Sequence, residues 1–349
     1  SLSCAAWLFL CRQPQNPKSK RRIIMKQLFR LILALMLILS LVACGQDVPS
    51  STPSGSSSQG PSVSQSVGTR PTTDRAENPI ILPEEVKVIV SLAPASTQVL
   101  CDLGLADRIA AVDTNSPAYA PDLGENVLQF DILDPDLEQL IALSPDLILV
   151  SNISSQGGDD IFRPLRDAGI CVAEIPTSNT LADVMLDVQF IADCAGASEA
   201  GQGLVSAMQA DLDAVSAIGK TITEPKTVLF EISPLPYLYS FGSGVYLDEM
   251  LTLIGAKNVL GDQEGWVPVT EESAVAANPD VILTSDNFSG GDPVAEILAR
   301  PGWEHVAAVE TQQVYYIDNG ASSLPNHHVA QALKEMARAI YPEAYASLK

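Results

Sequence analysis

Histidine and basic side chains are scarce in this chain of 349 residues. It holds three His and 20 Lys or Arg against 42 Asp or Glu, which gives a formal net charge of −22. Seven of the basic residues lie in residues 1–43, where no acidic residue occurs, so the rest of the chain is more acidic still. Such a charge repels nucleic acid and anionic lipid headgroups, and this argues against polyanionic partners.

Closely spaced cysteines and common catalytic motifs are also missing. The chain lacks a GxxxxGK[ST] phosphate loop, a GxSxG nucleophile turn and an HExxH zinc motif. Three of the six cysteines, Cys101, Cys171 and Cys194, lie in separate apolar runs without zinc-ligand spacing. We predict that these three are small buried residues, and a pairing of Cys171 with Cys194 stays open.

A short apolar segment near the amino terminus has the features of a secretion signal. Lys26 and Arg30 precede an apolar segment, 31–43, that is too short to span a bilayer of about 30 Å as a helix. The segment ends in LVAC, which resembles the lipobox of bacterial lipoproteins and implies cleavage before Cys44 and lipid on its sulfur. An ordinary signal peptide that happens to contain a cysteine is the alternative.

After a polar tether, short apolar runs alternate with helical patterns in two successive series, as in parallel α/β sheets. The expected strands are 86–92, 108–112, 147–150, 170–173, 227–232, 237–241, 281–284 and 314–317. The expected helices are 94–103, 136–143, 161–168, 246–254, 271–277 and 326–340, with a helical stretch at 181–218 that breaks near Gly196.

The fold class predicted from this alternation is α/β, with two parallel-sheet lobes joined by one long connecting helix and a ligand cleft between the lobes. The predicted divisions are 1–43 (upstream residues and signal peptide, with the true start at Met25), 44–79 (lipidated Cys and flexible Ser/Gly/Pro tether), 80–195 (N-terminal lobe), 196–219 (connecting helix) and 220–349 (C-terminal lobe).

One phrase occurs twice in the chain, as 142-ALSPDLILVS-151 and 276-AANPDVILTS-285. Every matching position is 134 residues apart, and Glu138 and Glu272 keep the same offset. A repeat of this length predicts two similar lobes. Because ligands lie beyond the carboxyl ends of parallel strands, the loops after the repeated strands are predicted to face a ligand. The alternative is that these Ser/Gly-rich loops are only turns.

Most of residues 85–349 resembles the class III solute-binding proteins of ABC importers, the group that carries cobalamin, ferric siderophores and haem. The segments that carry the resemblance are VIVSLAPASTQVLCDLGLADRIAAVD (88–113), LEQLIALSPDLILVS (137–151), GSGVYLDEMLTLIGAKNVL (242–260), VTEESAVAANPDVILTS (269–285), WEHVAAVETQQVYYID (303–318) and LPNHHVAQALKEMARAIYPE (324–343).

The resemblance implies a binding protein without enzymatic activity or cofactor, monomeric and held outside the cytoplasmic membrane by a lipid anchor. It implies capture of a small metal chelate and delivery to a permease dimer driven by a cytoplasmic ATPase. By the same resemblance, Glu138 and Glu272 dock onto arginines of the two permease subunits. Alternatively, each Glu only favours the first turn of its helix through the helix dipole.

Trp266 matches a tryptophan that lines the cleft in the cobalamin-binding member, and a flat aromatic suits a planar macrocycle. Packing in a core or loop is the alternative for Trp266. One of His327 and His328 could be an axial ligand to cobalt or haem iron. Adjacent residues in a regular helix point about 100° apart, so the two together cannot easily chelate one ion. The complete predicted ligand-facing set is Pro94, Tyr119, Phe130, Asn152, Ser240, Trp266, Asn287, Phe288, His327 and His328.

The scarcity of basic residues favours a corrinoid over anionic ferric siderophores or haem, which stay as alternatives. From other classes, a ligand-sensing surface receptor fits the same pattern. A surface metallohydrolase that uses His327 or His328 with Asp residues lacks the expected ligand spacing.

Overall fold

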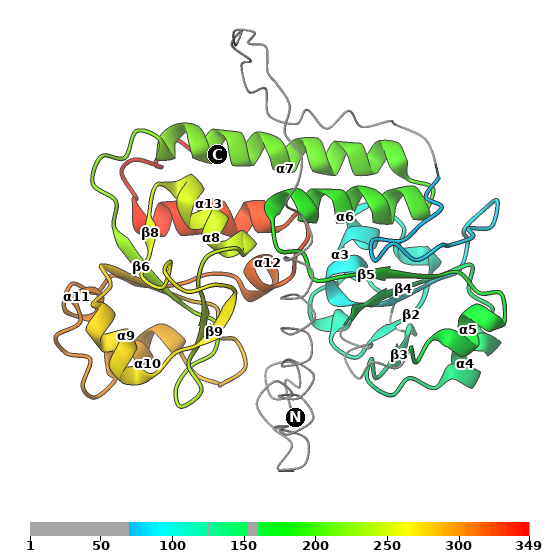
Figure 1. Cartoon of the computed structure of the whole chain (residues 1–349), viewed down its shortest axis with the longest axis horizontal. Helices are drawn as coiled ribbons and strands as arrows, with labels where there is room; N and C mark the ends of the chain where they lie inside the picture. Colours follow the sequence, from blue (N-terminus) through cyan, green and yellow to red (C-terminus); the bar gives the residue numbers. More distant parts are fainter. Residues whose placement is uncertain (1–69, 125, 153–159, 349) are drawn as a thin grey trace, which may run out of the picture. The chain divides into compact units, whose positions relative to one another are not determined.

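A computed structural model describes residues 70–124, 126–152 and 160–348, and residues 66–349 form one compact unit (Figure 1). The predicted signal peptide, the lipobox at Cys44 and most of the tether lie outside the described residues. Within the described ranges, no helix combines the length and the apolar character that crossing a bilayer requires.

The first lobe, here called the N-lobe, is built on a parallel sheet in the order β3-β2-β1-β4-β5. Both faces of this sheet are covered, which explains why its strands are almost continuously apolar. Ile89 packs with Leu147 and Leu149 on one face, whereas Val90 and Leu92 join the core on the other face. The strands are β1 (Ile89–Leu92), β2 (Ile109–Asp113), β3 (Leu128–Phe130), β4 (Leu147–Ser151) and β5 (Val172–Ile175).

Short helices connect the strands of the N-lobe. Pro94 occupies the start of the first of them, where its missing N–H costs no helical hydrogen bond. Asp136 caps another by accepting a hydrogen bond from the backbone N–H of Gln139 at 3.0 Å. The helices are α3 (Pro94–Asp102), α4 (Leu137–Ala142) and α5 (Arg163–Asp167), with 3-10 turns η2 (Ala106–Arg108) and η3 (Ser116–Ala118).

The second lobe, the C-lobe, has a parallel sheet in the order β11-β10-β6-β8 and an antiparallel ribbon of β7 with β9. The predicted strand at 237–241 therefore belongs to the ribbon rather than to the parallel sheet, because its partner at 266–268 runs in the opposite direction. The strands are β6 (Thr227–Glu231), β7 (Tyr239–Phe241), β8 (Lys257–Asn258), β9 (Trp266–Pro268), β10 (Val281–Thr284) and β11 (Val314–Tyr316).

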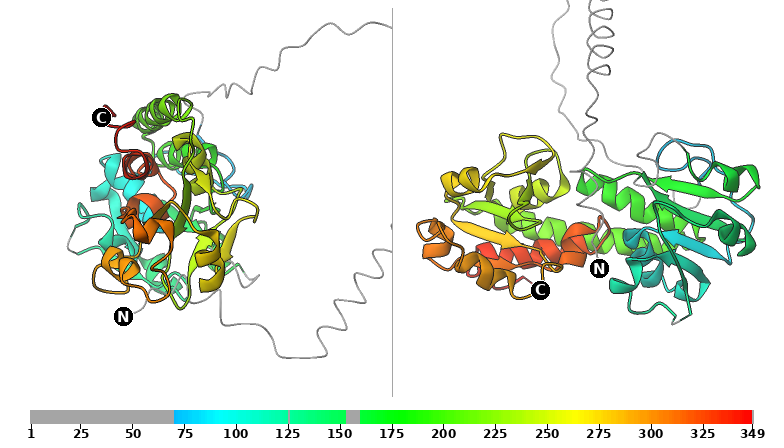
Figure 2. Two further views of the ribbon diagram at one scale, coloured as in Figure 1. Left: turned by 90° about the vertical axis from the view of Figure 1, so that its left-hand side faces the viewer. Right: turned by 90° about the horizontal axis from the view of Figure 1, so that it is seen from below.

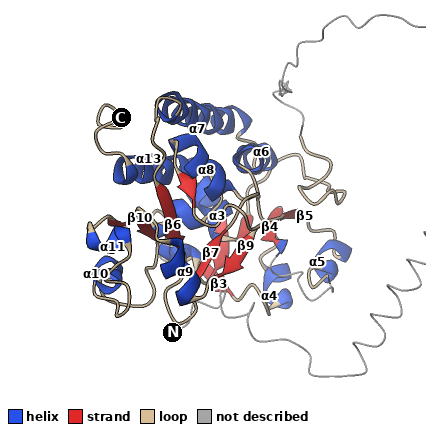
Figure 3. Cartoon of the chain, turned by 60° about the vertical axis from the view of Figure 1, so that its left-hand side comes forward, coloured by secondary structure: helices blue, strands red, loops and turns tan. Residues whose placement is uncertain are grey.

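Helices cover both faces of the C-lobe sheet, and Figure 3 shows the strands of each lobe flanked by helices. The last helix begins at Val329, three residues later than predicted, and a short helix precedes it. The helices are α8 (Tyr246–Ile254), α9 (Glu271–Ala277), α10 (Pro293–Leu298), α11 (Ala307–Glu310), α12 (Asn319–Ser323) and α13 (Val329–Ile340).

Two long helices, α6 (Leu181–Cys194) and α7 (Ser198–Gly219), lie between the lobes in the chain and pack against each other. They meet at Gly196, whose φ of +75° is a conformation that glycine adopts without steric cost. Helix α7 also packs against α8 and α13 (Figure 1).

Both helices contribute side chains to the cores of both lobes. In α6, Val184 packs in the C-lobe core and Val188 in the N-lobe core. In α7, Val205 belongs to the N-lobe core and Leu212 to the C-lobe core. The connection between the lobes is therefore a packed helical pair rather than an open linker, and Figure 2 shows the fold from two further sides.

The repeated phrase places the same element at the same position in each sheet. Strand β4 lies between β1 and β5, and β10 lies between β6 and β11. The Asp of each phrase holds the start of the neighbouring strand. Asp146 Oδ2 accepts hydrogen bonds from the backbone N–H groups of Lys87 and Val88 at 2.8 and 2.9 Å. Asp280 Oδ2 accepts from the N–H of Thr227 at 2.8 Å.

Candidate functional site

The carboxyl ends of the two sheets are joined by a hydrogen bond between the lobes. The hydroxyl of Tyr119, which follows β2, donates to Oδ1 of Asn319, at the start of α12, over 3.0 Å. Asn319 in turn donates from Nδ2 to the carbonyl of Ser285, just beyond β10, at 2.7 Å. A Cβ on Gly320 would lie 3.0 Å from the Tyr119 ring, so the glycine admits this close approach. Tyr119, predicted to face a ligand, thus lies where the two lobes meet.

A second contact between the lobes runs along α3. Asn326 is 1% exposed and donates from Nδ2 to Oε1 of Gln98 at 2.6 Å. Gln98 also donates to the backbone carbonyl of Tyr119 at 3.0 Å, which couples this contact to the first one. Buried amide pairs of this kind set the alignment of two packed surfaces, because an unpaired amide would be costly to bury.

The adjacent histidines continue this contact toward the far end of α3. Nε2 of His327 and Nε2 of His328 lie 3.1 and 2.7 Å from the same oxygen, Oδ2 of Asp102. Asp102 is the last residue of α3 and Pro94 the first, so about 12 Å of helix separates the two. The histidines therefore lie away from the carboxyl end of β1, where Pro94 lies.

The prediction that His327 and His328 lie within a regular helix was wrong. Both residues precede α13 and belong to a turn, so their rings are not constrained to helical directions. The rings lie 4.5 Å apart with an interplanar angle of 59°, and both reach one carboxylate. Burial alone would raise the pKa of Asp102, but hydrogen bonds from His327 and His328 lower this pKa well below its ordinary value.

Trp266 lies on the antiparallel ribbon, opposite Phe241 in the register of β7 with β9. Its ring meets the rings of Phe241 and Tyr246 nearly edge-on, with centroids 6.1 and 6.0 Å apart. It is only partly buried, so one part of the ring anchors to the C-lobe core while another part stays accessible. Phe288, in the loop after β10, is 46% exposed, and its neighbour Asn287 is exposed as well.

Other members of the predicted ligand-facing set lie deeper in the lobes. Phe130 is 5% exposed and packs in the N-lobe core with residues of β1 and β4. Ser240 is fully buried in β7, and its Oγ has no hydrogen-bond partner within the described residues. Asn152, directly after β4, accepts a hydrogen bond from Thr177 Oγ1 at 3.2 Å. Phe130 and Ser240 thus present no open face to a ligand in this structure.

Glu138 and Glu272 occupy matching exposed positions in the first turns of α4 and α9. Neither carboxylate has a hydrogen-bond or ion-pair partner in the part of the chain that the structure describes. Thr270 caps α9 just as Asp136 caps α4, through a hydrogen bond to the third backbone N–H of the helix. Each carboxylate is thus held on a capped helix with its hydrogen-bonding capacity unused.

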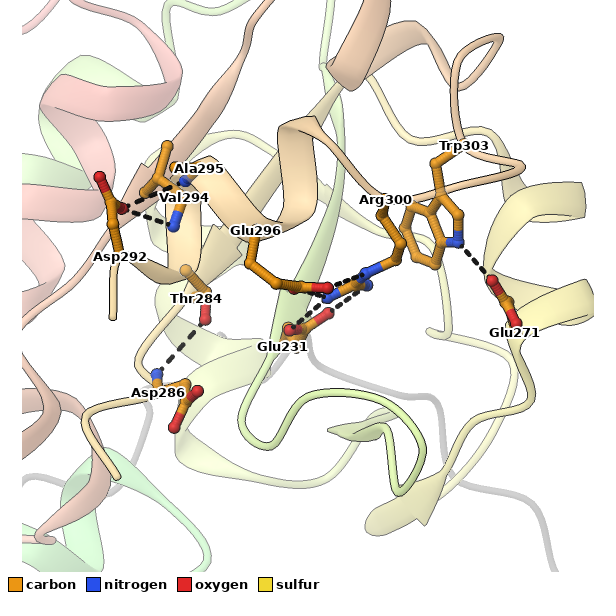
Figure 4. A network of polar contacts seen from close by, with 10 residues as sticks. All are labelled: Glu231, Glu271, Thr284, Asp286, Asp292, Val294, Ala295, Glu296, Arg300 and Trp303. Atoms are coloured by element: carbon orange, nitrogen blue, oxygen red, sulfur yellow. Dashed lines mark hydrogen bonds and ion pairs between the residues drawn. The ribbon is translucent and has the colours of Figure 1, made fainter. Parts of the chain in front are cut away.

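A buried ion pair beside α9 was not expected from the sequence (Figure 4). Arg300, which is 4% exposed, donates from Nη1 and Nη2 to the two carboxylate oxygens of Glu231 at 3.0 and 3.1 Å. Its guanidinium also lies 4.6 Å from the ring centroid of Trp303, which donates to Glu271 at 3.0 Å. Burial opposes the charge of Arg300, but hydrogen bonds to Glu296 and Glu231 raise its pKa above the ordinary value. The sequence signal that could have predicted this ion pair is Glu231, a charged residue at the end of an apolar strand.

The three cysteines of the described residues are free, so Cys171 and Cys194 do not pair. Burial raises the pKa of the Cys171 thiol to about 11 and that of Cys101 to about 11. Thiols of this kind are poor nucleophiles at neutral pH, and we assign them to packing.

A profile of the periplasmic binding protein family matches residues 89–321. An ABC transporter substrate-binding lipoprotein of Bacillus subtilis (strain 168), YvrC, is 32% identical over 274 residues, which cover 78% of this chain and 85% of that protein. The vitamin B12-binding protein of Vibrio campbellii is 26% identical over 254 residues, 71% of this chain and 87% of that protein.

The fold is also found among solved structures. The molybdate-binding protein MolA of Haemophilus influenzae, bound to molybdate, superposes with a TM-score of 0.68 at 22% identity, over 79% of this chain and 93% of that chain. The comparison confirms the predicted α/β fold of two parallel-sheet lobes. This chain therefore belongs to the periplasmic binding protein family, as an ABC-transporter substrate-binding protein rather than an enzyme.

Proposed function

We propose that this protein binds a corrinoid outside the cytoplasmic membrane and delivers it to an ABC permease. One observation carries the choice of ligand: the segments that follow β2, β4, β10 and β11 contain no Lys or Arg before the next helix, and Trp266 of the C-lobe is accessible in part. Residues 109–162, 258–299 and 301–333 contain no Lys or Arg. Arg300, which separates the last two of these segments, is buried and paired with Glu231.

This charge pattern disfavours the anionic ligands known for such folds. Molybdate, haem with its two propionates and carboxylate-rich siderophores need cationic side chains or several free N–H donors. In this protein, backbone N–H groups near the strand ends already donate hydrogen bonds to acidic side chains of the chain itself, so they are not free to bind an anionic ligand. Asp113 accepts from the backbone N–H groups of Asn115 and Ser116, and Asp286 accepts from those of Phe288 and Ser289.

A corrinoid fits the same surroundings because it is a large ring that carries amide groups and little net charge. Such a ligand is bound by aromatic faces and by neutral hydrogen-bonding groups. Trp266, Tyr119 and the amide of Asn287 are the described side chains that we assign to this role. The vitamin B12-binding relative from Vibrio supports the assignment.

We further propose that a lipid on Cys44 holds the protein at the outer face of the membrane, with the residues between Cys44 and Arg70 as a tether. The predicted tether ends too late, because residues 70–79 pack against the N-lobe, where buried Asp74 accepts a hydrogen bond from the backbone N–H of Glu174 at 2.9 Å. Delivery would use Glu138 and Glu272, one on each lobe, as contacts for arginines of the two permease subunits. Two carboxylates without partners on rigid helices suit bidentate binding of Arg.

The ligand is tested by titration of residues 66–349, which form a compact unit with complete cores. Cyanocobalamin, haemin, a ferric hydroxamate, a ferric catecholate and molybdate are each added while tryptophan fluorescence is recorded. This segment contains only Trp266 and Trp303, and Trp303 is fully buried. We expect saturable quenching by cyanocobalamin alone. Equilibrium dialysis, which needs no tryptophan signal, should give an affinity at least about tenfold weaker in Trp266→Ala.

Trp266→Phe is the matched control for this titration. Its remaining fluorescence comes from Trp303 and therefore measures optical absorption by the coloured ligand, which is subtracted from the wild-type signal. Saturable binding of haemin or a siderophore without binding of cyanocobalamin contradicts the corrinoid assignment but leaves the family intact. Binding of molybdate in its place contradicts the argument from charge.

A further inference from the structure

We propose that Asp102, His327 and His328 form a binding site for one divalent transition-metal ion, which ties the end of α3 in the N-lobe to the turn before α13 in the C-lobe. This site is separate from the proposed corrinoid contacts and does not depend on them. It would be a structural metal site that secures the alignment of the two lobes.

The three side chains already converge on one point. One ligand atom from each lies within 4.8 Å of the other two. In a tetrahedral zinc site, bonds of about 2.0–2.2 Å to nitrogen and oxygen separate the ligand atoms by about 3.3 Å. The observed separations between Asp102 Oδ2 and the two Nε2 atoms are 3.1 and 2.7 Å. These two separations would have to grow by about 0.2 and 0.6 Å to match the spacing of ligand atoms around an ion.

The ligand type also suits a transition metal. Two imidazole nitrogens and one carboxylate oxygen form a donor set that suits Zn²⁺, Co²⁺, Ni²⁺ or Cu²⁺ better than Ca²⁺ or Mg²⁺, which prefer oxygen ligands only. Nε2 is the ring atom of each histidine that faces the site, because it is the atom that lies 3.1 Å (His327) or 2.7 Å (His328) from Oδ2 of Asp102. Three protein ligands leave a fourth position for water.

The backbone around the histidines is fixed before any ion arrives. Oδ1 of Asn326 accepts a hydrogen bond from the backbone N–H of His328 at 2.8 Å, while Nδ2 of Asn326 donates to Gln98 in the N-lobe. Val329, the next residue, is fully buried at the start of α13. Rigid supports of this kind lower the entropy lost on binding, since the ligands do not have to be gathered.

Solvent can reach the site. The side chain of Asp102 is 37% exposed and that of His328 is 31% exposed, whereas that of His327 is 14% exposed. An ion can therefore enter without unfolding of either lobe. The simpler alternative is a latch without metal, in which the histidines only hydrogen-bond to Asp102.

The test uses residues 66–349 after treatment with a chelator, titrated with Co²⁺ while the visible absorption of the ion is recorded. We expect intense bands typical of four-coordinate Co²⁺ that saturate at one equivalent and are displaced by Zn²⁺. The thermal unfolding temperature should rise by about 5 °C at a hundredfold excess of Zn²⁺ over its Kd. The latch without metal predicts neither the bands nor the rise.

Variants locate the ion. His328→Gln and Asp102→Asn keep hydrogen-bonding capacity, and each is expected to weaken Co²⁺ binding at least about tenfold, as is His327→Ala. The matched controls are His305→Ala, the remaining and exposed histidine of the chain, and Asp107→Asn, an exposed acid next to α3. Circular dichroism without metal checks that each variant is folded.

Three results would overturn the proposal. The first is no saturable Co²⁺ spectrum in the wild-type segment, a measurement that needs no variant. The second is loss of binding in His305→Ala while the three site variants retain it. The third is saturation at half an equivalent together with a dimer in size-exclusion chromatography, which would mean that the ion joins two molecules instead of two lobes.

Discussion

The first strand of the N-lobe sheet ends in an apolar residue, whereas the strand at the same place in the C-lobe ends in a carboxylate. Leu92 of β1 pairs with Val150, and Glu231 of β6 pairs with Thr284, in registers that match between the sheets. Both Leu92 and Glu231 are fully buried. The N-lobe fills this position with hydrocarbon, while the C-lobe needs Arg300 to neutralise it.

This difference separates the features that a repeat must keep from those that it can vary. Asp146 and Asp280 both satisfy backbone N–H groups at the start of a strand, a requirement that every buried sheet shares. Ser144 and Asn278, two residues earlier, both have positive φ, at +49° and +43°. The last residue of the strand can differ between the lobes. An apolar side chain and a fully paired charged side chain both leave no buried polar group without a hydrogen-bond partner.

The largest expected effect breaks the C-lobe ion pair. Arg300→Met leaves Glu231 buried without its partner and should lower the free energy of unfolding by about 3–5 kcal/mol. Urea unfolding of residues 66–349 measures the loss. The double variant Glu231→Leu with Arg300→Met converts the C-lobe to the N-lobe arrangement and should recover most of that stability.

The reciprocal change tests the same comparison from the N-lobe. Leu92→Glu places a carboxylate at the matching position without an arginine and should destabilise the protein by a similar amount.

The double variant Glu231→Leu with Arg300→Met could instead be as unstable as Arg300→Met alone. In that case Arg300 would stabilise the C-lobe through Trp303 and Glu296 rather than through the neutralisation of Glu231.

The next effect concerns the exposed carboxylates that the two lobes share. Charge reversal in Glu138→Lys or Glu272→Lys should reduce cellular uptake of labelled cobalamin at least about tenfold, because each lysine would repel a permease arginine. Binding of cyanocobalamin and stability should stay close to wild type, since neither side chain has a partner within the described residues and surface changes cost about 0.5 kcal/mol or less.

Glu199→Lys, on the exposed surface of α7, is the matched control for charge and should transport normally. An equal loss of uptake in this variant would assign the effect to net charge. Unchanged uptake in both Glu138→Lys and Glu272→Lys would contradict docking through these residues and favour a receptor that senses its ligand without transport.

The smallest effect examines the repeated aspartates. Asp146→Ala and Asp280→Ala each remove hydrogen bonds to the start of a strand and should each lower the free energy of unfolding by about 1–2 kcal/mol. Asp134→Ala and Asp262→Ala, exposed positions of the respective lobes, serve as controls with little expected change. Markedly unequal losses in the free energy of unfolding for Asp146→Ala and Asp280→Ala would show that the two aspartates contribute differently to stability.

Much of this architecture followed from local pattern. Apolar runs such as 147–150 and 281–284 predicted buried parallel strands, and the offset of 134 residues placed them at matching positions. The break of the helical stretch at Gly196 was also predicted correctly. These features depend on residues that are close in the chain, and hydrophobic periodicity reports them directly.

Contacts between distant residues were decided only by the tertiary structure. Tyr119 and Asn319 are 200 residues apart, His328 and Asp102 are 226 apart, and Arg300 and Glu231 are 69 apart. Whether such side chains meet depends on how α3, α12 and the turn before α13 pack together, and no local pattern encodes that packing. The amino-acid sequence determined most strands of the two parallel sheets, the repeat and the scarcity of cations, because each is a property of neighbouring residues or of composition. The short strands β3, β8 and β9 were not predicted, because two or three residues carry too little pattern. The packing of the lobes decided which carboxylates are paired, which stay free and which meet two histidines.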